Sequence, residues 1–146
     1  SFRHSGVQPS RYIKGEFEYL EPYVRFDYRN PNHVNGKPLG DFALSNDLAD
    51  RLINVEQAKA LALDTFKVLS EFLLSKNIYL KDMCFMITTD GSRHYGEISS
   101  DNGRYLLLER DSNGQFKSLD KDVWRQGGTP EDTLKRWTEL ADRVEH

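Results

Sequence analysis

The stretch NVEQAKALALDTFKVLSEFLLSKNIYLKDMCFMIT, residues 54–88, decides the fold. Apolar residues recur at helical spacing from Val55 to Leu73, and Asn54 directly before them is a good N-cap. The pattern then changes to a short run rich in aliphatic and aromatic residues, 78–88, which is typical of a strand. We therefore predict a long helix that ends near Lys76 and runs directly into a strand.

The residues that follow this strand predict an antiparallel arrangement. Asp90-Gly91 is a tight-turn signal, so residues 95–99 are expected to return as a second strand. Residues 105–109 are expected to form a third strand, and Asn113-Gly114 turns the chain again toward Phe116. Connections this short can join only strands that run in opposite directions.

The two ends of the chain add further elements. Residues 16–28 predict a strand interrupted at Pro22, residues 29–41 a loop, and residues 45–53 a short helix. Thr129-Pro130 followed by two acids predicts the start of a closing helix. The apolar stripe expected to be buried on that helix consists of Leu134, Trp137, Ala141 and Val144.

The predicted fold class is α+β, a mostly antiparallel sheet packed by a long helix and a C-terminal helix. The length of 146 residues suits one domain spanning residues 1–146. The net charge of -3 argues against nucleic acid or an anionic membrane as partner. The chain has one cysteine, which excludes an internal disulfide, and together with the lack of a signal peptide this favours a cytoplasmic protein.

Two polar motifs could hold a charged ligand. GEISSDNGR, residues 96–104, predicts a strand that carries Glu97 and Ser99 on one face and a turn that presents Asp101 and Arg104. LDKDVWR, residues 119–125, places Lys121 and Arg125 one helical turn apart, where two cations can grip a phosphate. A salt-bridged acidic turn and a solvated basic face are the structural alternatives, and both stay open.

A third motif lies on the first strand. Strand alternation places Asp82, Cys84 and Met86 on one side, which therefore offers one carboxylate and two sulfurs. Magnesium prefers several oxygen ligands, so this side alone suits it poorly. Packing of the two sulfur side chains in the protein interior is the alternative.

These motifs, in this order, resemble those of the phosphoribosylaminoimidazole-succinocarboxamide synthetases (SAICAR synthetases). That family carries a strand similar to V-D-x-K-x-E-F-G, then D-E-I-S-P-D-x-x-R, then L-D-K-D-x-[FY]-R and a closing helix. Upstream, PYVRFDYRN (residues 22–30) and GDF (residues 40–42) are similar to P-x-V-x-F-x-x-K-x-D and G-D-P. Ser1-Phe2-Arg3 is similar to part of G-S-F-L-x-R, so the resemblance covers the C-terminal part of the family and implies that its N-terminal ATP-binding lobe is absent.

The resemblance implies an ATP-dependent ligase of purine biosynthesis that joins a carboxyaminoimidazole ribonucleotide to aspartate. ATP and Mg²⁺ are the implied cofactors, and a separate N-terminal lobe or subunit is an implied partner. The resemblance implies that the substrate phosphate is bound by Ser1, Arg104, Lys121 and Arg125. It implies that magnesium and ATP are faced by Asp82 and Glu97. The implied catalytic residues are Glu97 and Asp101, and Asp101 also shapes the substrate pocket.

The departures from the family pattern gather in one corner. Cys84, Met86 and Gly96 stand where the family has Lys, Glu and Asp, and Leu106-Leu107 replace Trp-Asp. Loss of two carboxylates and one cation weakens the expected Mg–ATP site.

Three interpretations stay open: a fragment or subunit of such a ligase, a non-catalytic or repurposed ribonucleotide-binding relative, and an unrelated α+β interaction domain. The residues upstream of Ser1 would separate the first two.

Overall fold

The computed structural model describes residues 11–13, 16–18 and 22–146, and within these ranges the chain divides into two compact units. The first unit contains the described residues up to Leu63 together with Thr88–Arg93. The second contains Asp64–Ile87 and His94–His146. Each unit is described separately below.

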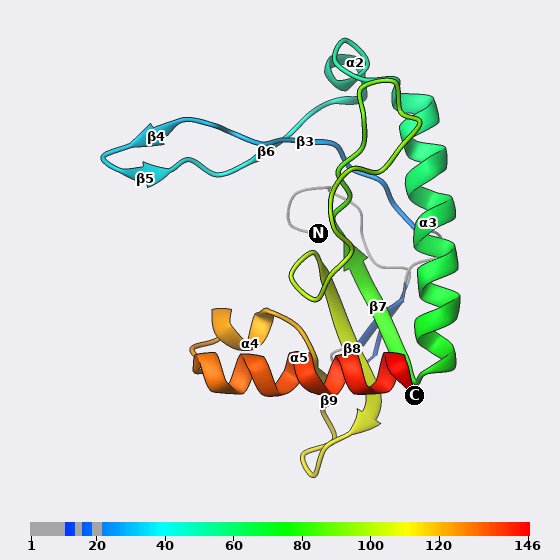
Figure 1. The fold of residues 1–146 in the computed structure, drawn as a ribbon, viewed down its shortest axis with the longest axis vertical. Coiled ribbons are helices and arrows are strands. Elements are labelled where there is room, and N and C mark those ends of the chain that lie inside the picture. Colours follow the sequence, from blue (N-terminus) through cyan, green and yellow to red (C-terminus); the bar gives the residue numbers. More distant parts are fainter. Residues whose placement is uncertain (1–10, 14–15, 19–21) are drawn as a thin grey trace. The chain divides into compact units, whose positions relative to one another are not determined.

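The described residues of the first unit contain short antiparallel strand pairs. They are β1 (Arg11–Ile13) with β2 (Glu16–Glu18), β3 (Asp27–Tyr28) with β6 (Phe42–Ala43), and β4 (His33–Val34) with β5 (Lys37–Pro38). Figure 1 shows the β4–β5 hairpin at the tip of the ribbon formed by β3 and β6. Asn35 and Gly36, both at positive φ, form its two-residue turn. The loop predicted for residues 29–41 therefore contains a small hairpin.

Two helices follow the ribbon. The short helix α2 (Asn46–Ala49) is capped by Ser45, whose hydroxyl accepts a hydrogen bond from Leu48 N. The long helix α3 (Val55–Ser75) begins after Asn54, whose Oδ1 accepts a hydrogen bond from Gln57 N at 3.1 Å. The prediction of a long helix capped by Asn54 is therefore confirmed. Its first turns belong to the first unit, and the part from Asp64 onward belongs to the second.

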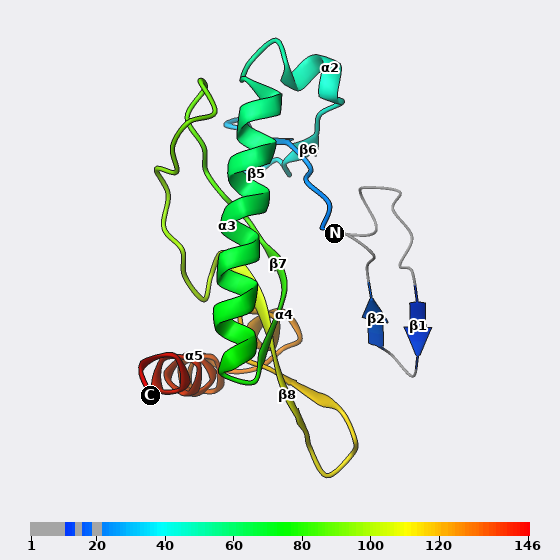
Figure 2. The same ribbon diagram turned by 90° about the vertical axis from the view of Figure 1, so that its right-hand side faces the viewer.

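A three-stranded antiparallel sheet forms the centre of the second unit. Its strands are β7 (Ile78–Met83), β8 (Gly103–Arg110) and β9 (Phe116–Ser118), with β8 in the middle. Ile78 pairs with Leu107 and Leu80 with Tyr105, so these four side chains lie on one face. Figure 2 shows β8 extending past β7 into the turn toward β9.

One face of this sheet carries the core. Ile78, Leu80, Tyr105 and Leu107 pack with Leu73 of α3 and Leu140 of α5 (Pro130–Glu145), and Leu119 completes the cluster. Both helices therefore cover the same face of the sheet. The predicted fold class, a mostly antiparallel α+β fold with a long helix and a C-terminal helix, is confirmed.

Three local predictions were wrong. The first strand ends at Met83 instead of Thr88, after a register shift between Leu80 and Asp82, so Cys84 and Met86 lie beyond the strand. Residues 95–99 form no strand, and only the single bridge between Ile87 and His94 precedes them. Of the stripe predicted to be buried on α5, Val144 packs against the core and Trp137 is half-buried, but Leu134 is 64% exposed and Ala141 is exposed. The buried residue of α5 is Leu140.

No helix in the described ranges is long and apolar enough to cross a membrane.

Candidate functional site

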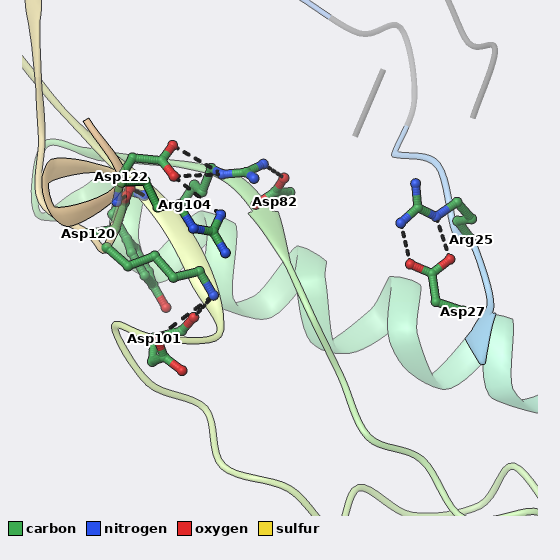
Figure 3. A network of polar contacts seen from close by, with 10 residues as sticks. Arg25, Asp27, Asp82, Asp101, Arg104, Asp120 and Asp122 are labelled. Carbon is green, nitrogen blue, oxygen red and sulfur yellow. Dashed lines mark hydrogen bonds and ion pairs between the residues drawn. The ribbon is translucent and has the colours of Figure 1, made fainter. Parts of the chain in front are cut away.

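The two polar motifs meet at the start of β8 in the second unit. Lys121 Nζ donates a hydrogen bond to the main-chain carbonyl of Asp101, and it lies 3.9 Å from the Asp101 carboxylate. Figure 3 shows Asp101 in the same close-up as Arg104, Asp120 and Asp122. The structure thus brings together residues 20 positions apart that the sequence had assigned to one ligand.

Arg104 occupies the middle of the cluster. Its Nη1 lies 2.5 Å from Asp82 Oδ2 on the neighbouring strand, and its Nε lies 3.1 Å from Asp122 Oδ2 in α4 (Asp122–Arg125). Burial alone would lower the pKa of Arg104, but the charges of Asp82 and Asp122 outweigh this effect and raise the pKa above its usual value. The guanidinium is therefore a fixed positive charge near the start of the central strand β8 (Figure 3).

Lys121 and Arg125 are joined by one helical turn, as predicted. Arg125 N donates to Lys121 O at 3.2 Å, and Arg125 Nη1 lies 3.5 Å from Asp122 Oδ1. The Arg125 side chain is 53% exposed, and this contact is long. Arg125 is thus more accessible to a ligand than Arg104, whose side chain is 25% exposed.

Asp120 holds this motif against β8. Its Oδ2 accepts a hydrogen bond from Tyr105 N at 2.7 Å, and its Oδ1 accepts one from Asp122 N at 2.8 Å. Burial raises the pKa of Asp120, and the two backbone N–H groups oppose that rise. On a solvated basic face, Asp120 would only be a counter-charge to the neighbouring cations, whereas here it is buried and bonded to the backbone. Its position immediately after the buried Leu119 was the signal of a structural role.

The turn that carries Glu97 and Asp101 is held by side-chain contacts in place of a strand ladder. Asn102 Nδ2 donates to Glu97 O at 2.7 Å, Asp101 N donates to Ser99 Oγ at 3.2 Å, and the Tyr105 hydroxyl donates to Ser99 O at 2.9 Å. Among the described residues, the Glu97 carboxylate makes no hydrogen bond or ion pair, and it is exposed.

The corner that departs from the family pattern is packed differently. A Cβ added at Gly96 would lie 3.0 Å from Met86 Cβ and 3.1 Å from Met86 Cγ. Tyr95 N donates to Met86 O at 3.1 Å, so the two segments run side by side there. The methionine thus fills the space that a side chain at position 96 would need.

These donors do not fit a magnesium ion. Met86 and Gly96 contribute no oxygen ligand, and Asp82 is engaged by Arg104. Within the described ranges, no group of three or more His, Cys, Asp and Glu side chains is placed to hold a metal ion. Magnesium needs near-octahedral oxygen coordination, which this corner does not supply. Ser1, the remaining residue of the predicted phosphate site, lies outside the described residues.

The fold matches solved SAICAR synthetases. The enzyme from Pyrococcus horikoshii superposes with a TM-score of 0.73 at 24% identity, over 91% of this chain and 56% of that one. A SAICAR synthetase in complex with ADP gives a TM-score of 0.69 at 26% identity, over 88% of this chain and 52% of that one.

The sequence also matches the SAICAR synthetase family over residues 21–143, and the chain belongs to that family. It is 34% identical over 133 residues to the phosphoribosylaminoimidazole-succinocarboxamide synthase of Methanopyrus kandleri, covering 88% of this chain and 51% of that protein. It is 32% identical over 155 residues to the bifunctional cordycepin biosynthesis cluster protein 3 of Cordyceps militaris, covering 82% of this chain and 18% of that protein. The chain thus spans about half the length of the synthase and a smaller part of the cordycepin protein.

Proposed function

We propose that this chain forms the ribonucleotide-binding part of a SAICAR synthetase-like ligase, acting as a fragment or subunit that an ATP-binding lobe completes. The ligase would join a carboxyaminoimidazole ribonucleotide to aspartate at the expense of ATP. The observation that carries the proposal is the convergence of Arg104, Lys121 and Arg125, from both family motifs, near the start of β8.

Two cations of this cluster are placed to release their carboxylate partners and bind a phosphate instead. Three cations contact three carboxylates, those of Asp82, Asp101 and Asp122, and the buried Asp120 lies in the same cluster. An incoming phosphate would take over the contacts of Lys121 and Arg125, because these two cations hold their carboxylates at 3.9 and 3.5 Å. Asp122 would remain paired with Arg104 and keep it in position. Ser1 is proposed to add a hydroxyl donor to the same phosphate.

The remaining proposed roles concern the reacting groups. In the ligation, the substrate carboxylate is activated by phosphoryl transfer from ATP, the aspartate amine attacks it, and phosphate leaves. Glu97 is exposed and free of ion pairs among the described residues, which suits a carboxylate that faces the nucleotide or accepts a proton. Asp101, anchored by its main chain, is proposed to shape the substrate pocket. No step is assigned to magnesium, because the donors present do not fit it.

The test is aspartate-dependent ADP release by the complete gene product in the presence of the carboxyaminoimidazole ribonucleotide. Replacing Arg125 by Met should raise KM for the ribonucleotide by about 10- to 100-fold, the range for a lost hydrogen bond to a charged group. Arg51→Met is the matched control, since Arg51 is an exposed arginine of the first unit. Equal KM values for the two variants would contradict the phosphate assignment.

A second candidate function is a non-catalytic or repurposed ribonucleotide-binding module. The packing of Met86 against Gly96 favours it, because that contact replaces two family carboxylates with a thioether and a glycine. The similarity to a protein of cordycepin biosynthesis supports use of this fold in a different nucleotide pathway. Such a module would bind the ribonucleotide in a thermal-shift assay while Mg–ATP binds weakly. Micromolar binding of Mg–ATP would exclude this candidate.

A further inference from the structure

An apolar groove lies next to the Lys121–Asp101 contact. It has a volume of about 400 Å³ and is lined by Trp124, Pro130, Leu134 and Trp137, with Asp101 and Lys121 completing the wall. Trp124 is 57% exposed and Leu134 is 64% exposed. Exposed large apolar side chains that gather around a hollow of this size are typical of a ligand site.

Two backbone motifs build this groove. Helix α4 ends in a Schellman motif, in which Gly128 N donates to Val123 O at 2.9 Å and Gly127 N donates to Trp124 O at 3.1 Å. Gly127 adopts φ +90, and a Cβ at Gly128 would lie 2.8 Å from Val123 O. Directly afterwards, Thr129 and Asp132 form the capping box that starts α5. The tight connection places Trp124 near Leu134 and Trp137 on the next helix.

The lining defines the chemistry of the occupant. Indole faces stack on flat heteroaromatic rings, and the aliphatic side chains of Leu134 and Pro130 add apolar contact area. The Asp101 carboxylate, whose side chain is 60% exposed, can accept hydrogen bonds from amino groups on such a ring. Lys121 borders this groove and also belongs to the phosphate corner with Arg125. A ring carrying amino groups and joined to a phosphate complements both.

We propose that this groove binds the amino-substituted heteroaromatic ring of a nucleoside monophosphate, stacked on Trp124, while the phosphate binds Lys121 and Arg125. The proposal rests on the phosphate corner proposed above and adds to it the position of the base. It assigns Trp124, Leu134 and Trp137 a role in binding that neither family motif by itself specifies.

Tryptophan fluorescence tests this directly, because the chain has two tryptophans and both line the groove. AMP and the aminoimidazole carboxamide ribonucleotide are titrated separately into the full chain, and the difference in affinity shows which ring is preferred. Saturable quenching or a spectral shift by either nucleotide is the expected result. Adenosine should give the same spectral change at higher concentration, because it lacks the phosphate.

Variants then separate stacking from charge. Trp124→Ala should weaken nucleotide binding at least about fivefold, the lower range for loss of a stacked base. Leu134→Ala should weaken it less, because it removes only apolar contact area. Both side chains are largely exposed, so these variants should fold. Tyr95→Ala removes an equally exposed aromatic residue outside the groove and should leave binding unchanged. Arg125→Met should weaken AMP binding while leaving adenosine binding unchanged, because Arg125 belongs to the phosphate corner and does not line the groove.

Three outcomes would overturn the proposal. One is a nucleotide that stabilises the chain thermally without any change in tryptophan fluorescence. In that case ribose 5-phosphate should stabilise the chain as much as the nucleotide does. That result would support the phosphate corner and would reject the groove as the site of the base. The second is the absence of both signals, which would reject both proposals. The third is concentration-dependent self-association that Trp124→Ala abolishes, with no nucleotide response, which would assign the groove to a second copy of the chain.

Discussion

At the scale of single residues, the candidate site depends on a carboxylate that is too buried to meet a ligand. Asp120 is 1% exposed, and it ties the motif that carries Lys121 to the central strand through two backbone N–H groups. Lys121, Asp122 and Arg125 can converge with Arg104 only while this connection holds. The most exposed cation of the cluster, Arg125, and its most buried acid, Asp120, thus have separate tasks.

Loss of this carboxylate should destabilise the protein in proportion to the donors left unpaired. Asp120→Ala orphans two buried N–H groups, at about 1–3 kcal/mol each. Asp120→Asn keeps one acceptor and turns an amide NH₂ toward the other donor, so it should cost less. Equilibrium urea unfolding measures both. Asp142→Asn, at an exposed position of α5, should change stability by less than about 0.5 kcal/mol. Wild-type stability of Asp120→Ala would contradict the structural role of this residue.

At the scale of elements, the turn at residues 88–92, in the segment that follows β7 and precedes β8, is fixed by one carboxylate. Asp90 accepts hydrogen bonds from the Thr88 hydroxyl, from Ser92 N and from the Ser92 hydroxyl. These bonds, that from Thr88 foremost, lower the pKa of Asp90 to about 2. They favour the ionised form, which stabilises the turn.

The pH dependence of this turn follows from that lowered pKa. Because the unfolded value is 3.8, the stabilising contribution is fully present above pH 3.8 and is lost as the pH falls through about 2. A carboxyl-carbon NMR titration should give a midpoint near 2 for Asp90 in the wild type. Thr88→Val should move the midpoint up toward 3.8, whereas Thr133→Val on α5 should leave it unchanged. An Asp90 midpoint near 3.8 in the wild type would show that these hydrogen bonds do not persist in solution.

Gly91 in the same turn is required both by its backbone conformation and by its close approach to α3. It has φ +78, and a Cβ there would lie 2.8 Å from both Ala58 N and Asn54 O at the start of α3. Gly114 has a similar φ of +72 but open space around it. Gly114→Ala should therefore cost only the left-handed backbone penalty of about 1–2 kcal/mol. Gly91→Ala should cost clearly more in urea unfolding, and equal costs would show that the close approach to α3 is relaxed in solution.

The helices were predictable from the sequence because their signals are local. The helix starts are marked by Asn54, Thr129 and Pro130. Each acts within a single helical turn, through a capping hydrogen bond or through the fixed φ of proline. The strand predicted at residues 95–99 was wrong because alternation does not reveal competing side chains. There Asn102 and Ser99 bond to the backbone that a strand ladder would need. Leu134 fits a helical stripe, but its exposure depends on how α5 lies against the sheet.

At the scale of the whole molecule, the predicted family is confirmed, but the residue types at Cys84, Met86 and Gly96 differ from the family pattern. The motifs with Arg104 and Lys121 were found from sequence because their order and spacing are retained. That Asp82 would pair with Arg104 was missed, because the two residues were assigned to different ligands and only strand pairing brings them together. Leu107, which stands where the family has Asp, is 2% exposed and belongs to the core. Leu107 and Met86 thus pack against other residues at positions where the family keeps charge, whereas Cys84 is exposed.

Restoring the family carboxylates tests whether this corner alone separates the chain from ordinary Mg–ATP chemistry. Gly96→Asp by itself should destabilise the protein, because its Cβ would press on Met86 at 3.0 Å. Met86→Glu removes the thioether from that space, so the double variant should be more stable than the sum of the single effects predicts. The same double variant supplies two oxygen ligands and should bind Mg–ATP more tightly than the wild type in calorimetry. Additive stabilities would show that Met86 and Gly96 are not coupled. Unchanged Mg–ATP affinity in a well-folded double variant would place the determinants of Mg–ATP binding elsewhere, at Cys84 or in the proposed ATP-binding lobe.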